Sequence, residues 1–139
     1  MAPSPEAIRT LFDNLSDTNT QSEFFAHVAD NVDWWIVGST QMSGNYSSKQ
    51  QFLDATIEIL NGKVLNGPLG FGVVQVSGGG SGSDWATVEM QAIDAKCKNG
   101  MPYDMRYCWV VRFGKDDVIE QVKAYLDTEL LSRAIRENQ

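Results

Sequence analysis

The first half of the chain contains stretches in which apolar residues recur every three or four positions, as on one face of an amphipathic helix. A first helix is predicted to begin after Ser4, because Ser-Pro is a typical helix start, and its apolar positions continue to Leu15. A second short helix is predicted around Phe24. A third is predicted from Ser48 to Asn61-Gly62, a pair that often ends helices.

The second half is rich in β-branched, aromatic and turn-forming residues, a pattern typical of strands. A closing helix is predicted after Asp127, whose side chain is expected to act as its N-cap. Helices, then consecutive antiparallel strands, then a helix indicate an α+β fold with helices on one face of a curved sheet. The predicted strands cover residues 32–37, 71–76, 85–98, 101–113 and 118–126.

The Asn99-Gly100 pair predicts a two-residue hairpin turn of type I′, in which both residues adopt positive φ. This turn would place Met90 opposite Trp109 in the next strand. A second turn over residues 114–117 would place Trp109 beside Val122. Because side chains alternate between the faces of a sheet, both registers predict one aromatic-rich face. That face carries Tyr103, Met105, Tyr107, Trp109 and Val111.

The composition fits one globular domain, with 42% hydrophobic and 21% charged residues among 139. Acidic residues outnumber basic residues 18 to 11, and the formal charge of −7 argues against nucleic acid or an anionic membrane as partner. No apolar run reaches the roughly 18 residues that a membrane-spanning helix needs. The first residues show no signal-peptide pattern, so a cytoplasmic location is expected.

The chain offers few ligands for a metal ion. It has one histidine and two cysteines, Cys97 and Cys108, without a paired Cys-x-x-Cys motif, so no metal site is predicted. The hairpin register keeps the two cysteines several residues apart along the strands, which excludes a disulfide within the hairpin. Free thiols and no organic cofactor are therefore expected.

Ordered sequence blocks resemble the SnoaL-like, ketosteroid-isomerase-related group of the nuclear transport factor 2-like superfamily. The blocks are Trp34 to Gly38, Gly44-Asn45-Tyr46, residues 103–108 (Tyr-Asp-Met-Arg-Tyr-Cys) and residues 125–128 (Tyr-Leu-Asp-Thr). Residues 99–113 are also similar to the C-terminal half of bacterial ketosteroid isomerases. The resemblance implies a single SnoaL-like domain over residues 1–139. It also implies a cone-shaped, cystatin-like fold in which N-terminal helices close a hydrophobic pocket on a curved antiparallel sheet.

The catalytic set of ketosteroid isomerase does not fall on suitable residues here. The resemblance places the oxyanion-binding aspartate position on Trp109, the base position on or next to Ile36, and the helix-one tyrosine position on or near Phe12. Limonene epoxide hydrolases use an Arg-x-Asp pair, whereas this chain has Asp104-x-Arg106, with both side chains expected on the outer face. Neither mechanism is therefore predicted.

Tyr107 and Asp94 are the candidate catalytic residues. Tyr107 is predicted to donate a hydrogen bond to a ligand carbonyl in a dry pocket. Asp94 is the one carboxylate expected on the aromatic face, where partial burial would suit it to acid–base work; the alternative is a salt bridge with Lys96. The predicted ligand-binding residues are Trp34, Tyr46, Met90, Tyr103 and Trp109.

Asp127 and His27 each have a structural interpretation beside a catalytic one. Asp127 is interpreted first as a helix cap with an added contact to Arg106, and His27 as a surface or half-buried residue rather than a general base. The outer face carries Ile93 and Val110 among polar residues, which predicts a homodimer through that face.

Two functions fit these observations. The first is a cofactor-independent isomerase or cyclase that acts on an apolar, carbonyl-bearing molecule such as a polyketide- or terpenoid-like substrate. The alternative is a non-catalytic binder of an apolar ligand, or a subunit used in assembly. A buried carboxylate or histidine that meets Tyr107 in the pocket would favour the enzyme, and a wholly apolar and aromatic pocket would favour the binder.

Overall fold

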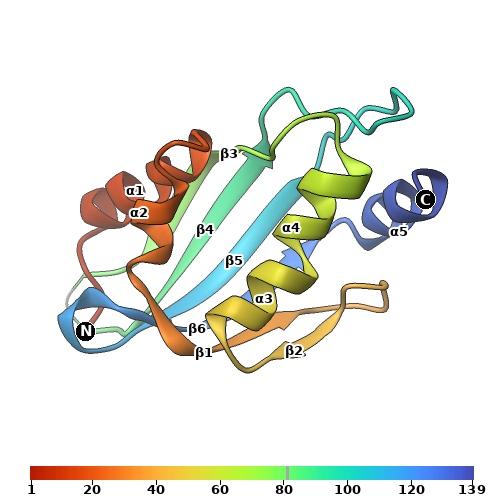
Figure 1. Cartoon of the computed structure of the whole chain (residues 1–139). Coiled ribbons are helices and arrows are strands. Elements are labelled where there is room, and N and C mark those ends of the chain that lie inside the picture. Colours follow the sequence, from red (N-terminus) through yellow and green to blue (C-terminus); the bar gives the residue numbers. More distant parts are fainter. Residues whose placement is uncertain (81) are drawn as a thin grey trace.

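Six strands form one mixed sheet in the computed structural model, which describes residues 1–80 and 82–139. The sheet curves around a set of helices on its concave side (Figure 1). The strand order is β2-β1-β6-β5-β4-β3. The strands are β1 Val28–Ile36, β2 Gly44–Tyr46, β3 Phe71–Gly78, β4 Trp85–Ala92, β5 Arg106–Phe113 and β6 Ile119–Leu126.

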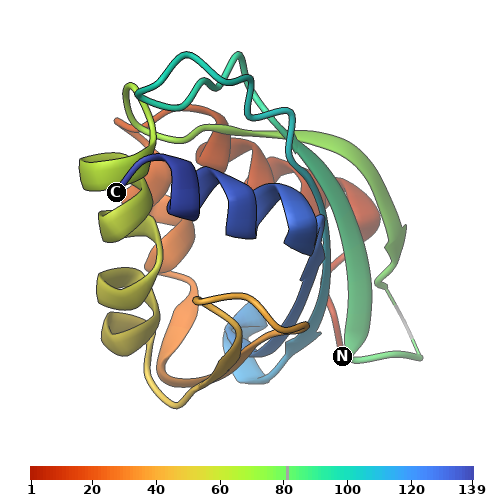
Figure 2. The same ribbon diagram turned by 90° about the vertical axis from the view of Figure 1, so that its right-hand side faces the viewer.

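Helices pack against this sheet from both ends of the chain, as Figures 1 and 2 show. They are α1 Pro5–Asp13, α2 Gln21–Phe25, α3 Lys49–Ala55, α4 Ile57–Ile59 and α5 Thr128–Glu137, with short helical turns η1 Asn14–Ser16, η2 Leu60–Val64 and η3 Lys115–Asp117. The predicted caps are confirmed: the side chain of Ser4 accepts a hydrogen bond from the backbone N–H of Ala7 at 3.1 Å, and that of Asp127 from Leu130 at 3.0 Å. None of the described helices is long and apolar enough to cross a membrane.

The helix predicted from Ser48 to Gly62 is interrupted, so that prediction was wrong in its extent. Thr56 has φ −125° and ψ −79°, which ends α3 one residue earlier. Its buried hydroxyl donates to the carbonyl oxygen of Phe52 at 2.7 Å, a bond that competes with regular helix geometry. The chain then makes one turn of α4 and a π-helical turn that continues past Gly62 to Val64. This irregular segment forms one wall of the fold.

The sequence predicted an antiparallel sheet, but one pair of neighbouring strands in the structure is parallel. β1 lies between β2 and β6, and it runs parallel to β6 with Trp34 beside Val122. The first strand therefore enters the sheet next to the last one. The short helix predicted around Phe24 is α2, which ends at Phe25, and β1 begins soon after it at Val28.

The hairpin between β4 and β5 has a different register from the predicted one. Met90 faces Tyr107 instead of Trp109. The loop has three residues and ends in Gly100, which adopts φ +89°. The N–H of Gly100 donates to the carbonyl oxygen of Cys97 at 2.9 Å, and the N–H of Cys97 donates to that of Met101 at 2.8 Å. Asp94, with φ +44°, adds a second irregularity. The two irregularities together shift the pairing by two residues, so the partners change but the faces do not.

The hairpin between β5 and β6 is displaced in the same way. Trp109 faces Ala124 instead of Val122, because the loop between the paired residues Phe113 and Ile119 is one residue longer than predicted and the register shifts again between Arg112 and Phe113. The shift is again an even number of residues, so Tyr107 and Trp109 stay on the concave face. The predicted aromatic-rich face is therefore confirmed although its cross-strand partners were wrong.

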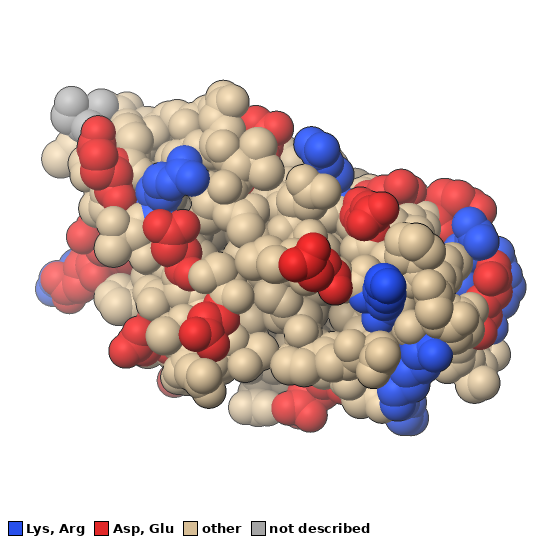
Figure 3. Space-filling model, turned by 90° about the horizontal axis from the view of Figure 1, so that it is seen from above, with Lys and Arg blue, Asp and Glu red and all other residues tan. Residues whose placement is uncertain are grey.

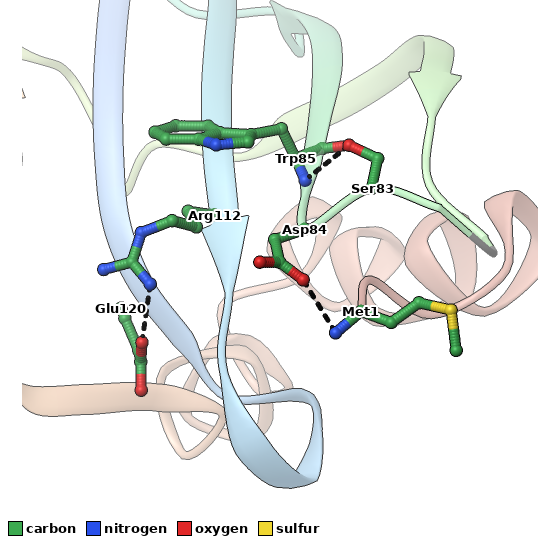
Figure 4. A network of polar contacts seen from close by, with 6 residues as sticks. All are labelled: Met1, Ser83, Asp84, Trp85, Arg112 and Glu120. Atoms are coloured by element: carbon green, nitrogen blue, oxygen red, sulfur yellow. Dashed lines mark hydrogen bonds and ion pairs between the residues drawn. The ribbon is translucent and has the colours of Figure 1, made fainter.

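Two surface ion pairs lie at the end of the sheet where β4 begins (Figure 4). The amino group of Met1 contacts Asp84 at 2.7 Å, and its hydrogen bond and charge lower the pKa of that carboxyl. The guanidinium of Arg112 contacts Glu120 at 2.8 Å. Such exposed pairs contribute little stability, and none of these residues lines the internal cavity described below.

Candidate functional site

A small cavity lies between the concave face of the sheet and residues of α3, α4 and α5. Figure 2 shows these helices on the concave side of the sheet. Its volume is about 40 Å³, room for no more than a few water molecules. The sheet provides a wall of rings and small side chains, and the helices provide Phe52, Thr56 and aliphatic side chains. The main contributors from the sheet are Trp34, Ile36, Phe71, Tyr107, Trp109 and Ala124.

Trp109 lies at the centre of the aromatic cluster that supports this wall. Its ring contacts Trp34 edge-on, with centroids 5.0 Å apart, and lies 5.5 Å from Phe71. On its other sides it meets Phe12 and Phe24 from the first two helices, at 6.2 and 6.3 Å. Edge-to-face arrangements of this kind fix ring orientation. Trp109 therefore holds the cavity wall in place as well as lining it.

Four of the seven predicted site residues line the cavity: Trp34, Tyr103, Tyr107 and Trp109. Met90 is buried in the core beside Tyr107 but does not reach the cavity. Tyr46 packs behind the wall: its hydroxyl donates to the carbonyl oxygen of Met42 at 2.7 Å, and burial raises its pKa.

The placement of Asp94 on the aromatic face was wrong. β4 ends at Ala92, and the following residues leave the strand, so the alternation of faces no longer applies to Asp94. Its side chain is exposed, and it makes no salt bridge to Lys96. The structure therefore does not bring Asp94 together with Tyr107.

Three buried polar atoms in the cavity wall have no hydrogen-bond partner among the described residues. They are Nε1 of Trp34 and the hydroxyl oxygens of Tyr103 and Tyr107. Trp34 and Tyr103 are 0% exposed and Tyr107 is 8% exposed. Buried polar groups are almost always paired, so three unpaired groups around one cavity require an explanation.

Both hydroxyls are neutral donors over the whole physiological pH range. Burial raises the pKa of Tyr103 to about 12, an effect that the neighbouring Tyr107 hydroxyl partly offsets. Burial, with a smaller effect of Tyr103, raises the pKa of Tyr107 well above 10. A ligand in the cavity would therefore meet O–H and N–H groups and no phenolate.

Within residues 1–80 and 82–139, no carboxylate, histidine, lysine or arginine lines this cavity. His27 is exposed and contacts the carbonyl oxygen of Glu23 at 3.1 Å, a local contact near the end of α2. The described residues also contain no cluster of three or more histidine, cysteine or acidic side chains that could hold a metal ion.

A second hollow, of about 320 Å³, lies on the outer face of the sheet. It is lined by Arg106, Cys108, Tyr125 and Asp127 among others. Asp127 is occupied as the cap of α5, which supports its structural interpretation. Asp104 and Arg106 are both exposed, as expected for the outer face.

Sequence reasoning missed several cavity residues, including Met42, Phe52, Thr56, Leu69, Phe71 and Leu131. Phe52 and Thr56 fall within the helix predicted from Ser48, but nothing in the sequence shows that this helix covers the aromatic side of the sheet. Met42 lies in a loop between β1 and β2, where no periodicity predicts burial.

No protein-family model matches the sequence. The sequence is similar to the dimerizing cyclase phiC of a fungal species (strain ATCC 74256), with 25% identity over 132 residues. The match covers 95% of this chain and 57% of that protein, so the chain spans little more than half of its relative's length.

The structure is similar to solved proteins over nearly its whole length. An NTF2-like protein of Burkholderia thailandensis has a TM-score of 0.74 and 18% identity, with 95% of this chain and 97% of that chain covered. A candidate isomerase of Rhodopseudomonas palustris has a TM-score of 0.66 and 19% identity, with 99% of each chain covered. The chain therefore has the nuclear transport factor 2-like fold, which confirms the predicted α+β architecture and the resemblance that implied it.

Proposed function

We propose that this protein is an isomerase- or cyclase-type enzyme that holds an apolar, carbonyl-bearing molecule, polyketide- or terpenoid-like, in the cavity. The observation that carries the proposal is a pair of tyrosines, Tyr103 and Tyr107, that line an otherwise apolar cavity and whose buried hydroxyls have no hydrogen-bond partner among the described residues. A ligand carbonyl oxygen would accept from these donors. The cyclase and isomerase names of two similar proteins support the same class of reaction.

The tyrosine hydroxyls can activate a substrate carbonyl by donating hydrogen bonds to its oxygen. Donors fixed in an apolar site stabilise negative charge as it develops on a carbonyl oxygen, and losing one such donor typically lowers the rate about 10²- to 10³-fold. The aromatic and aliphatic walls would hold the reacting carbons close together. Because no described residue of the lining can act as a charged base, the site favours a cyclisation or rearrangement within the substrate over abstraction of a proton by the protein.

The cavity has to widen to admit such a molecule, since sites for drug-sized ligands measure roughly 300–1,000 Å³. The sheet wall is held by backbone pairing between neighbouring strands, whereas the opposite wall from Phe52 to Leu60 is interrupted at Thr56 and runs into a π-helical turn. Movement of this helical wall, with the Met42 loop, is the proposed route of entry.

A non-catalytic binder of an apolar ligand is the second candidate function. The same lack of a charged group in the described lining favours it, because binding needs only burial and hydrogen bonds. The two functions differ in what leaves the cavity: an enzyme releases an altered molecule, and a binder releases the one that entered.

We also propose a homodimer through the outer sheet face. Trp35 on β1 and Tyr125 on β6 are 42% and 45% exposed, and Ile93 beside β4 is 44% exposed. The word dimerizing in the fungal relative's name describes either a dimeric protein or a reaction that joins two molecules, and a homodimer is consistent with it. Both cysteines are free thiols, and a cytoplasmic location is part of this proposal.

No partner other than a small apolar molecule and a second copy of the chain is proposed. Acidic and basic side chains are interspersed on the face seen in Figure 3, without a continuous basic surface that would attract nucleic acid or an anionic membrane.

Native mass spectrometry of the purified protein, followed by extraction under denaturing conditions, tests the proposal first. A co-purified carbonyl compound that Tyr107→Phe no longer retains supports the site, and its conversion by the wild-type protein supports the enzyme. Tyr125→Phe is the matched control, because it removes the hydroxyl of a tyrosine outside the cavity. Equal retention by both variants would contradict a role for Tyr107.

A further inference from the structure

Three asparagines in this chain are followed directly by glycine: Asn61, Asn66 and Asn99. In such a pair the backbone nitrogen of the glycine can attack the side-chain carbonyl carbon of the asparagine, because glycine has no Cβ to block the approach. Asparagine is accordingly one of the thermally labile residues of proteins. The reaction needs an asparagine side chain that can turn and a glycine N–H that is not engaged, so the fold decides which pair reacts.

The Asn99-Gly100 pair is held at the atoms that this reaction uses. The side-chain oxygen of Asn99 accepts a hydrogen bond from the N–H of Met101 at 3.0 Å. The nitrogen of Gly100, which would have to attack, donates its hydrogen to the carbonyl oxygen of Cys97 at 2.9 Å. The N–H of Asn99 also donates to the side chain of Asn138 at 2.8 Å, which ties this turn to the end of α5. Several hydrogen bonds must therefore open before this pair can react.

The Asn61-Gly62 pair is held by a different part of the fold. It lies inside the π-helical turn η2, and the side chain of Asn61 is half-buried. The side-chain oxygen of Asn61 accepts a hydrogen bond from the N–H of Leu69 at 2.9 Å. Reaction at this pair would require both the turn and this contact to open.

The Asn66-Gly67 pair, in contrast, is exposed and unbonded at the reacting atoms. None of the described residues forms a hydrogen bond with the side chain of Asn66 or with the N–H of Gly67. Gly67 adopts φ +104°, and no atom lies within 4 Å of the position that a Cβ would take there. The N–H of Asn66 donates to the carbonyl oxygen of Lys96 at 2.8 Å, so the pair is the open part of an anchored segment.

We infer that Asn66 is a site of spontaneous modification, at which its side chain and Gly67 close a succinimide ring. The nitrogen of Gly67 forms a bond to Cγ of Asn66, the bond from Cγ to Nδ2 breaks, and the proton of the attacking nitrogen leaves with Nδ2 as ammonia. Water then opens the ring at either carbonyl and leaves an aspartate or an isoaspartate. Nothing is oxidised or reduced, and water is the only co-reactant.

The modification is expected to reach the wall of the cavity. Leu69, three residues after Asn66, lines the cavity and is 1% exposed. Leu65, on the other side of the pair, is also 1% exposed and is bridged to Cys97. In an isoaspartate the main chain runs through the side chain and is longer by one carbon atom, and both products carry a negative charge. Because the added atom lies between two buried anchors, we expect the packing of Leu69 to loosen.

Mass spectrometry of tryptic peptides tests the inference, because trypsin separates the three pairs. Cleavage after lysine and arginine leaves Asn61 in peptide 50–63, Asn66 in peptide 64–96 and Asn99 in peptide 99–106. The purified protein is incubated at neutral and at mildly alkaline pH, either folded or unfolded in guanidinium chloride. The gain in mass from asparagine to aspartate is followed with time in each peptide. Isoaspartate is identified by labelling with protein isoaspartate methyltransferase.

In the folded protein, Asn66 is expected to react at least about tenfold faster than Asn61 and Asn99, because a single hydrogen bond can lower the population of an open form by about tenfold. In guanidinium chloride the three pairs should react at similar rates, since the protection of Asn61 and Asn99 depends on the fold. Asn66→Gln, which retains an exposed amide, should abolish the mass gain in peptide 64–96. The modified protein should unfold at a lower denaturant concentration than fresh protein.

Two results would overturn the inference. One is a similar rate at all three pairs in the folded protein, because the fold would then not select Asn66. The other is an Asn66 that stays intact in the folded protein and reacts only in guanidinium chloride. Modification at Asn66 without a change in stability would support the site and overturn its effect on Leu69. None of these results depends on the ligand of the cavity, so the proposed function is tested separately.

Discussion

Trp34 and Phe52 stack face to face, with ring centroids 3.8 Å apart and planes inclined by 20°, and this contact joins the sheet wall of the cavity to the helical wall. Trp34 comes from β1 and Phe52 from α3, and both are almost fully buried. The stack is therefore the contact that must loosen if the helical wall moves to admit a ligand.

Phe52→Ala should open this contact. We expect the free energy of unfolding to fall by about 3–5 kcal/mol, the usual effect of removing a buried phenylalanine ring. Phe52→Leu should cost less and should increase affinity for bulky apolar ligands, because part of the wall is removed while the core stays filled. Urea denaturation and ligand titration measure the two effects. A loss below about 1 kcal/mol in Phe52→Ala would show that the stack contributes little to the wall.

Tyr103→Phe and Tyr107→Phe should each stabilise the free protein. A buried hydroxyl without a partner costs about 1–3 kcal/mol, so removing it should raise the free energy of unfolding by about 1 kcal/mol. Ligand affinity should fall in the same variants. Stability gained together with binding lost is the mark of a functional polar group.

Tyr46→Phe is the matched control for that experiment. The Tyr46 hydroxyl donates to the carbonyl oxygen of Met42, so its removal should destabilise the protein by about 1 kcal/mol. If all three tyrosine variants change stability in the same direction, the Tyr103 and Tyr107 hydroxyls are not unpaired in solution.

The stability of the protein should decrease at high pH because of the buried tyrosines. The pKa of Tyr103 rises from 10 to about 12 on folding, so between these values the unfolded chain releases a proton that the folded protein keeps. This contribution is fully present below pH 10 and is lost as the pH rises to about 12. Two pKa units correspond to about 3 kcal/mol. Denaturation at pH 9, 10, 11 and 12 measures it.

Tyr103→Phe should remove a large part of that pH dependence, and Tyr103→Phe/Tyr107→Phe should remove more, since the pKa of Tyr107 is also raised. Absorbance at 295 nm, which reports tyrosinate, should show a late-titrating fraction that both variants reduce. An unchanged titration curve in the double variant would contradict the burial of the two hydroxyls.

Asp127→Ala separates a helix cap from a catalytic acid. The carboxylate accepts from the N–H of Leu130 at 3.0 Å and stabilises the first turn of α5, so its loss should cost about 1 kcal/mol. Asp127→Asn, which retains a capping oxygen, should restore most of this stability. Ligand affinity and turnover should be the same in both variants at a temperature where they are folded. A loss of turnover in the folded Asn variant would assign Asp127 a chemical role.

The residues that face the cavity from β5 could be predicted from sequence, whereas their partners across the sheet could not. Side chains alternate between the two faces of a strand, so a register error of an even number of residues leaves Tyr107 and Trp109 on the predicted face. In both hairpins the observed register differs from the predicted one by two residues. The length of each loop decides the partner. Gly100 at φ +89° serves equally well in a two-residue and a three-residue loop, so the Asn99-Gly100 pair alone does not distinguish them.

Asp94 shows where a periodic pattern stops being informative. The sequence continues through this position in alternating fashion, but the backbone adopts φ +44° there and the strand has already ended. Such a conformation depends on how the neighbouring segment closes over it: the N–H of Ile93 donates to Gly70 at 3.0 Å. A contact between residues so far apart cannot be predicted from the sequence around either of them.

The parallel pairing of β1 with β6 also determines when the cavity can exist during synthesis. Gln121 donates to Asp33 at 3.2 Å across a separation of 88 residues, and the Trp34 wall lies beside this contact. A ribosome must therefore release β6 before β1 can join β5 through it, and chains that lack β6 can hold only the separate β1–β2 and β3–β4–β5 pairs. Contacts so distant in sequence slow folding, because a large loop must close before they form. The protein is thus expected to acquire its ligand only after the whole sheet is complete, and nascent chains cannot be loaded.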